Sequence, residues 1–238
     1  MSAVDWVLAS LAIFAGACAQ GSMGFGLGMI AAPFLAMIEP SLIPAPVLIV
    51  AMGLAALVAW RERASLDARG LKWAIAGRVP GSALGTYAVV VLPEQTLLVV
   101  FAVLILAGVG LSVAGWRVEP TPTTQAGAGA LSGFMGSITS VGGPPMALLY
   151  QRRSGAELRA TLSLFFLFGT TLSVTLLAAA GKLHGRDVGR AGILLGPMVA
   201  GFLVARWLAP RLDAGLLRPV LLWVSGAAAT VVLLSALW

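Results

Sequence analysis

The chain has 238 residues, of which 59% are hydrophobic and 10% are charged, whereas soluble domains carry about 25% charged residues. This composition excludes an ordinary soluble domain, and the apolar runs are long enough to cross a bilayer. The net charge of +6 comes from short loops between apolar runs, where basic residues set membrane orientation, so it does not indicate nucleic-acid binding.

The first half of the chain contains apolar runs that we expect to form helices at residues 4–20, 29–38, 44–60, 73–92 and 95–116. A glycine-rich stretch, Gly21 to Pro33 (GSMGFGLGMIAAP), separates the first two of these runs. Because the bilayer interior offers no water to satisfy free backbone groups, a break at this place indicates a special structural or functional role.

The second half repeats this order. Residues 126–150 contain another break, Gly-Gly-Pro-Pro at 142–145, and we expect helices at 160–180, 191–208 and 216–237. Gly201 follows Gly85 by 201 − 85 = 116 residues, about half the chain. The sequence therefore predicts an all-α polytopic membrane protein with a first repeat at 1–116, a polar linker at 117–125 (RVEPTPTTQ) and a second repeat at 126–238. Internal repeats of this kind are common in secondary transporters.

The positions of Lys and Arg distinguish two arrangements of these halves. If each broken segment is one full span, eight spans divide the 15 basic residues 9 to 6 between the two sides. If each broken segment is a hairpin that enters and leaves on one side, only Lys182, Arg186 and Arg190 lie opposite the other basic residues, a split of 12 to 3. The positive-inside rule favours the second arrangement.

The hairpin arrangement predicts two inverted repeats, each with a Gly/Pro-broken helical hairpin and three transmembrane helices. Both termini are then expected outside the cytoplasm, in a multi-pass protein of the cell inner (plasma) membrane. Residues 126–150 are too few for two full spans, so we expect this hairpin to turn inside the membrane.

The two breaks predict half-helices whose N-termini could bind an anion. Pro144 and Pro145 suit the first turn of one half-helix, and Pro33 suits the start of the other. Helix N-termini present free N–H groups and the positive end of the dipole, and glycines let a ligand approach the backbone. The alternative is structural, since glycines also let helices pack closely and serines bond to their own backbone.

Arg78 lies inside an apolar run and is either a counter-charge for an anion or a side chain that extends to the membrane surface. Hydroxyl and amide side chains near the breaks add possible donors, with Thr170 as a pore-lining candidate. The predicted anion-binding residues are Gln20, Ser22, Gly24, Gly26, Gly28, Pro33, Arg78, Ser137, Thr139, Ser140, Gly142, Gly143, Pro144, Pro145 and Thr170.

The stretches GFGLGMIAAPFLAM and GFMGSITSVGGPPMALLYQRRSGAELRATLS resemble the paired motifs of the sulfite exporter TauE/SafE family. The motif residues of that family fall here on Gly24, Gly26, Gly28, Pro33, Gly142, Gly143, Pro144 and Pro145. The resemblance implies a carrier that moves sulfite, organosulfonates or related small anions, generally outward and without ATP.

Other function classes have less support in the sequence. An enzyme is not expected, because the chain has one His and one Cys and no catalytic or metal-binding motif, and no cofactor is predicted. A passive anion channel, a carrier of another small organic anion and a structural membrane protein remain alternatives. The expected partners are a small anionic substrate and the lipid bilayer, and a homodimer is possible.

Overall fold

The computed structural model describes residues 1–66, 68, 71–114, 118–150, 153, 155–208 and 214–237. These residues form ten α-helices and two short 3-10 helices, at 40–42 and 63–65, and they include no strand. Six of the helical segments are long and apolar enough to cross a membrane, which confirms the predicted all-α multi-pass class. The α-helices are α1 (Ala3–Met23), α2 (Leu27–Ile38), α3 (Ala45–Arg61), α4 (Leu71–Val91), α5 (Glu94–Ala114), α6 (Pro122–Thr139), α7 (Gly143–Leu149), α8 (Gly155–Ala179), α9 (Gly185–Leu208) and α10 (Ala214–Leu237).

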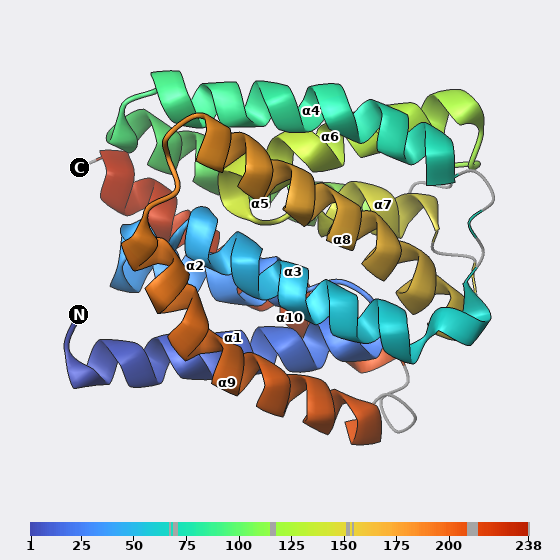
Figure 1. Ribbon diagram of the computed structural model, residues 1–238, viewed down its shortest axis with the longest axis horizontal. Coiled ribbons are helices and arrows are strands. Elements are labelled where there is room, and N and C mark those ends of the chain that lie inside the picture. Colours follow the sequence, from blue (N-terminus) through green and yellow to red (C-terminus); the bar gives the residue numbers. More distant parts are fainter. Residues whose placement is uncertain are drawn as a thin grey trace.

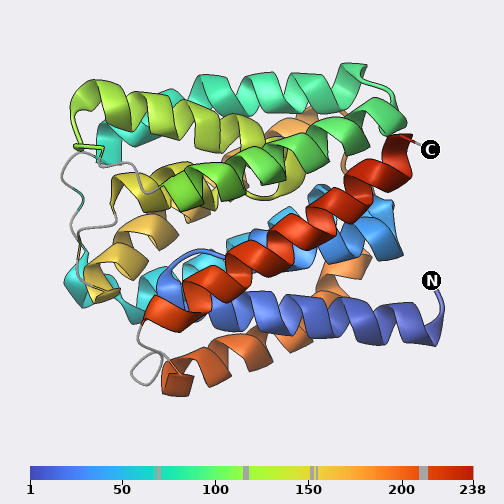
Figure 2. The same ribbon diagram turned by 180° about the vertical axis from the view of Figure 1, so that it is seen from behind.

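The helices pack in pairs that combine the two halves of the chain. Figure 1 shows α4 beside α6 along one edge and α1 beside α9 along the opposite edge, and Figure 2 shows the same pairs from behind. Between these edges α3 packs against α8, and α5 packs against α10. Large apolar side chains such as Leu11, Leu84, Val113 and Trp223 are exposed on the outside, where lipid would cover them.

Glycines bring α4 and α6 into close contact. A Cβ atom added at Gly81 would lie 2.0 Å from the carbonyl oxygen of Ala130, and one at Gly129 would lie 2.0 Å from that of Ala74. Helices in lipid associate through close backbone packing at small residues, and this pair follows that rule. Helix α6 begins at Pro122, inside the segment predicted as a linker, because Thr121 caps its first turn by accepting from the Thr124 N–H.

Both termini lie at one end of the molecule (Figure 1). At the other end, which we call the basic end, lie Arg61, Arg63, Lys72, Arg153, Arg159 and Arg206. An ion pair of 3.0 Å between Arg159 Nε and Glu62 Oε1 joins the chain after α3 to the start of α8 at this end. The eight-span arrangement would place these two segments on opposite sides of the membrane, whereas this ion pair joins them directly. The basic residues Arg69, Arg117, Arg152 and Arg211 of the predicted charge distribution lie outside the described residues, and so does the side chain of Arg218.

Candidate functional site

The first break separates α1 from α2 at three residues. Gly24 ends α1 in the left-handed conformation with φ 89°, and Gly26 precedes α2 with φ 131°, a region that side chains rarely permit. The side-chain oxygen of Gln20 accepts a hydrogen bond of 3.3 Å from the Leu27 N–H, the first of α2. Glycine conformations and this amide cap therefore set the start of α2, which lies six residues before Pro33.

Pro33 was predicted to begin this half-helix, and that prediction is wrong, because Pro33 lies inside α2. A proline cannot donate to the carbonyl four residues earlier, which here belongs to Met29. The Ser225 hydroxyl of α10 donates to the Met29 oxygen at 2.6 Å instead. A neighbouring helix thus supplies the bond that proline removes, and α2 continues through it.

The second break lies between α6 and α7. Ser140 ends α6 with φ 59°, the one described residue other than glycine with a positive φ, and its hydroxyl donates to the Pro44 oxygen at 3.2 Å. Thr139 caps the same helix end, since its hydroxyl donates to Met135 O and accepts from the Val141 N–H. Pro144 and Pro145 occupy the first turn of α7, as predicted.

The two breaks meet in the interior. A Cβ atom at Gly28 would lie 2.1 Å from the Ser140 oxygen, and one at Gly143 would lie 3.2 Å from Phe25. Between them is a cavity of about 30 Å³, which has room for about one water molecule. Eight of the predicted residues line this cavity, namely Gln20, Gly26, Gly28, Arg78, Ser140, Gly142, Gly143 and Thr170.

Arg78 is the charged group of this cavity. Its side chain is 1% exposed, so it does not extend to the membrane surface. One guanidinium nitrogen donates to the Ser132 hydroxyl at 2.8 Å, and the Ser132 hydroxyl donates to Gly142 O at 2.6 Å. The guanidinium also lies 4.7 Å from the ring centre of Phe165.

The guanidinium has spare hydrogen-bonding capacity. Its Nε has no hydrogen-bond partner, and no carboxylate of the described residues pairs with it. A buried charge is costly unless it is paired, so a cation of this kind favours an anionic ligand. The backbone at Gly169 leaves space for it, because a Cβ there would lie 1.8 Å from Arg78 Nε.

Seven predicted residues lie outside the cavity lining: Ser22, Gly24, Pro33, Ser137, Thr139, Pro144 and Pro145. The hydroxyl of Ser137 is paired with that of Ser173 at 2.8 Å. Thr170 lines the cavity, but its hydroxyl donates to Phe166 O at 2.7 Å within its own helix, so it can only accept from a ligand.

Sequence reasoning missed several residues that shape the site. Ser132, Phe165 and Gly169 hold or accommodate the guanidinium, and Phe25, Met29 and Phe166 line the cavity. The sequence spacing could have indicated Ser132. It precedes Gly136, which lines the cavity, by one helical turn, so both residues lie on the same face of α6. Apolar side chains such as Phe165 give no comparable signal.

A larger cavity of about 370 Å³, which we call the vestibule, opens at the end that holds both termini. Its lining includes Pro44, Glu94, Lys182 and His184. Ala45 and Leu177 of the vestibule lining pack with Leu48 of the inner cavity lining in one apolar cluster. Apolar side chains of α3 and α8 thus lie between the two cavities.

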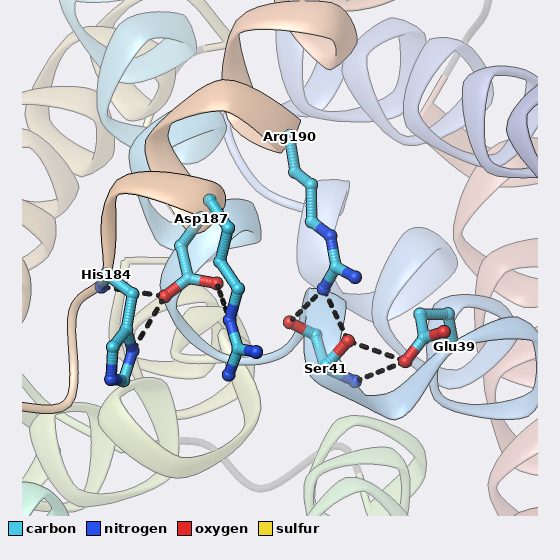
Figure 3. Close-up of polar contacts among 6 residues, drawn as sticks. Glu39, Ser41, His184, Asp187 and Arg190 are labelled. Atoms are coloured by element: carbon cyan, nitrogen blue, oxygen red, sulfur yellow. Dashed lines mark hydrogen bonds and ion pairs between the residues drawn. The ribbon is translucent and has the colours of Figure 1, made fainter. Parts of the chain in front are cut away.

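Two polar clusters lie at the rim of the vestibule (Figure 3). Asp187 accepts from the His184 N–H at 2.9 Å, which caps the start of α9. Arg190 donates to Ser41, and Ser41 donates to the Glu39 carboxylate, which lowers the pKa of Glu39. These contacts hold the chain between α2 and α3 against α9.

The basic end is closed over the first break. Glu62 pairs with both Arg61 and Arg159, at 2.9 and 3.0 Å. The two arginines also donate to the last carbonyl groups of α1, Arg61 to Gly21 and Arg159 to Ser22. Cations at a helix C-terminus are favoured by the helix dipole, so this network stabilises the closed arrangement.

The described residues contain no group of His, Cys, Asp and Glu side chains that could hold a metal ion. No curated protein and no solved structure is significantly similar to this chain. The family model of the sulfite exporter TauE/SafE family matches residues 8–232, nearly the whole length. This match confirms the resemblance given by the two motifs, and the chain belongs to the TauE/SafE family of sulfite exporters.

Proposed function

We propose that this protein exports small sulfur-containing anions, such as sulfite or organosulfonates, across the cell inner membrane. The anion binds between the two helix breaks near the middle of the bilayer. Membership of the TauE/SafE family supports the substrate class, and six helices able to span a membrane support the multi-pass location. Because TauE/SafE is a family of transporters, membership of it does not support an enzymatic function.

The observation that carries the proposal is the buried guanidinium of Arg78 at the cavity between the breaks. Its Nε is without a partner, and no described carboxylate neutralises it. An oxyanion would supply both the missing charge and the missing acceptor. A guanidinium stays protonated throughout the physiological range, so it holds the anion without competing for its proton.

The half-helices add weaker donors. Helix α2 has 12 residues and presents the N–H groups of its first turn, of which Leu27 is already bonded to Gln20. Helix α7 has 7 residues and begins Gly143-Pro144-Pro145, so two of its first-turn positions lack an N–H. The backbone therefore contributes mainly through α2 and Gly143, and Arg78 supplies the dominant attraction.

A carrier fits the closed geometry better than the alternative of a passive channel. The inner cavity is too small for an anion with a sulfur and several oxygens, and it is separated from the vestibule. Binding therefore requires the helices around the breaks to move apart. We propose that this motion relates two inverted repeats, at 1–116 and 126–238 with a linker at 117–125, which is supported by the like order and pairing of their helices.

Anion flux into liposomes that contain the purified protein tests this function. We expect saturable flux of sulfite or an organosulfonate and at least about a tenfold loss in Arg78→Gln, because removing one charge of a buried pair costs about 2–5 kcal/mol. Arg63→Gln, which changes an arginine at the basic end that stacks on Trp60, is the matched control and should keep normal flux.

Flux that is unchanged in Arg78→Gln would move the site elsewhere. Flux of sulfite no greater than that of a small carboxylate would favour a carrier of another organic anion, and rates far above carrier turnover would favour a channel. A homodimer is a separate proposal that a mass measurement of the solubilised protein would test.

A further inference from the structure

Two buried hydroxyl groups on α4 have no hydrogen-bond partner. Ser82 is 0% exposed and Thr86 is 5% exposed, and neither oxygen finds a partner. The hydroxyls of Thr139, Thr170 and Thr171 instead donate to the carbonyl four residues earlier in their own helices. Inside a membrane an unpaired hydroxyl is unfavourable, so Ser82 and Thr86 require another reason to be present.

Ser82 and Thr86 continue the face of α4 that carries Arg78. The three residues are spaced at intervals of four, which places them one above another along the helix. They therefore form a polar stripe that begins at the guanidinium and runs toward the end of α4 at Val91.

A second pair of hydroxyls comes from α6 and α8 at the same level. The Ser137 and Ser173 oxygens lie 2.8 Å apart, and both residues are 0% exposed. A Cβ atom at Gly85 of α4 would lie 3.0 Å from the Ser137 Cβ, so the pair lies beside the residue that precedes Thr86. Three helices thus bring four buried hydroxyl groups into one region, and we call Ser82, Thr86, Ser137 and Ser173 the hydroxyl layer.

The hydroxyl layer lies between Arg78 and the vestibule. On α4 the vestibule-lining Val89 follows Thr86 by three residues, and on α8 Leu177 follows Ser173 by four. On α6 the vestibule-lining Ile138 directly follows Ser137. Each of the three helices therefore passes from the hydroxyl layer to the vestibule within about one turn.

We propose that the hydroxyl layer is the outer half of the anion path, between α4, α6 and α8, and that it connects Arg78 with the vestibule. This inference rests on the proposed function. Hydroxyl groups can donate to an anion that has lost its water, and they carry no charge that would trap it. The hydrogen bond from Ser140 to Pro44 then holds the second break against the start of α3 and does not lie on the path.

Cysteine accessibility tests this route. In a Cys18→Ala background, Ser82→Cys and Thr86→Cys are reconstituted in liposomes and exposed on both sides to an anionic, sulfonate-bearing thiosulfonate reagent. Thr171→Cys is the matched control, because Thr171 is exposed on the outer surface of α8. We expect Thr86→Cys to react at least about tenfold faster than the control, since thiols in apolar surroundings are inert. Added sulfoacetate should slow that reaction.

The mass of the protein reports the modification, so this experiment does not depend on measured transport. Reaction of Ser82→Cys and Thr86→Cys no faster than that of Thr171→Cys would overturn the route, even if wild-type protein exports sulfite. Fast, anion-protected reaction in a protein that moves no sulfur anion would retain the route and reject the proposed function. In a transporting protein, Thr86→Val should reduce flux by about tenfold, the loss of one hydrogen bond to a charged group.

Discussion

The proposed repeat places helices α4 and α9 in corresponding positions of the two halves, yet the interior faces of these helices differ in chemistry. With the 116-residue offset that relates Gly85 to Gly201, Arg78, Ser82 and Thr86 of α4 correspond to Leu194, Met198 and Phe202 of α9. Leu194 and Met198 are 0% and 2% exposed and belong to an apolar cluster against which Phe202 packs. At the positions that the proposed repeat pairs, α4 is therefore polar and α9 is apolar.

This difference separates what packing needs from what function needs. Helix α9 packs against α1 and α3 with apolar side chains on this face, while α4 packs against α6 and α8. Since the apolar face of α9 packs without polar side chains, close packing alone does not account for the arginine and hydroxyls of α4. Their desolvation cost is understandable if they serve an anion.

The strongest test of this comparison replaces Arg78 of α4 with leucine, the residue at the paired position of α9. We expect Arg78→Leu to abolish measurable anion flux, a loss of about a hundredfold or more, because an anion in the cavity would face no compensating charge. The control is Leu194→Met at the corresponding position of α9, a change that conserves volume and should leave flux near that of wild type. Flux assays on liposomes measure both, and near-normal flux in Arg78→Leu would contradict the asymmetry.

A second pair of variants asks whether the position of the guanidinium matters as well as its charge. Gly169 and Gly53 are 169 − 53 = 116 residues apart. A Cβ at Gly169 would lie 1.8 Å from Arg78 Nε, whereas one at Gly53 would lie 3.3 Å from the mobile end of Met198. Gly169→Ala should displace the guanidinium and lower flux roughly ten- to a hundredfold, as small misplacements of a binding group do.

Gly53→Ala should change flux little, because a flexible Met side chain adapts to a methyl group. The melting temperature of each variant in detergent shows whether the protein is still folded. Equal losses of flux in the two variants would mean that both positions serve packing alone.

The sequence was sufficient for the large elements of this fold. Runs of apolar residues predict the long helices, and the Pro-Pro pair after two glycines predicts α7, because two prolines fit only the first turn. The same rule failed at Pro33, where a hydroxyl from α10, distant in the sequence, replaces the lost backbone bond. A local rule cannot include that partner.

The candidate site was predictable in the glycines of its two breaks and in Arg78, but not in the directions of its hydroxyl groups. The glycines of the two breaks follow from their spacing, but the direction of a hydroxyl depends on which helix lies opposite. Ser137 and Thr139 were both expected near the anion. The Ser137 hydroxyl pairs with Ser173 in the hydroxyl layer, whereas the Thr139 hydroxyl caps its own helix. Ser82 was not predicted at all, since a serine in an apolar run gives no sign of lacking a partner.

The close packing that α4 shares with α6 gives a smaller, structural prediction. A Cβ at Gly81 would lie 2.0 Å from the Ala130 backbone oxygen, while one at Gly196 of α9 would meet nothing within 4 Å. Gly81→Ala should therefore separate α4 from α6 and destabilise the protein by about 1–3 kcal/mol. Thermal melting in detergent should show a drop of several degrees for Gly81→Ala and none for Gly196→Ala, which removes an unneeded glycine from a helix.

The smallest expected effect concerns the polar contact of Arg190, near the start of α9, with Ser41. Helix α4 has alanine, Ala74, at the position paired with Arg190, so it cannot make this contact. The Ser41 hydroxyl lowers the pKa of Glu39, so the ionised carboxylate is favoured in the folded protein. A lowered pKa contributes stability above the ordinary Glu value, about 4.3, and this contribution is lost as the pH falls through the folded value. Glu39→Gln should thus lower stability at pH 7 by at most a few tenths of a kcal/mol, as expected for an exposed contact, and should remove this part of the pH dependence. Melting curves of wild type and Glu39→Gln between pH 7 and pH 3 would converge, whereas a constant gap would assign the effect to packing and not to charge.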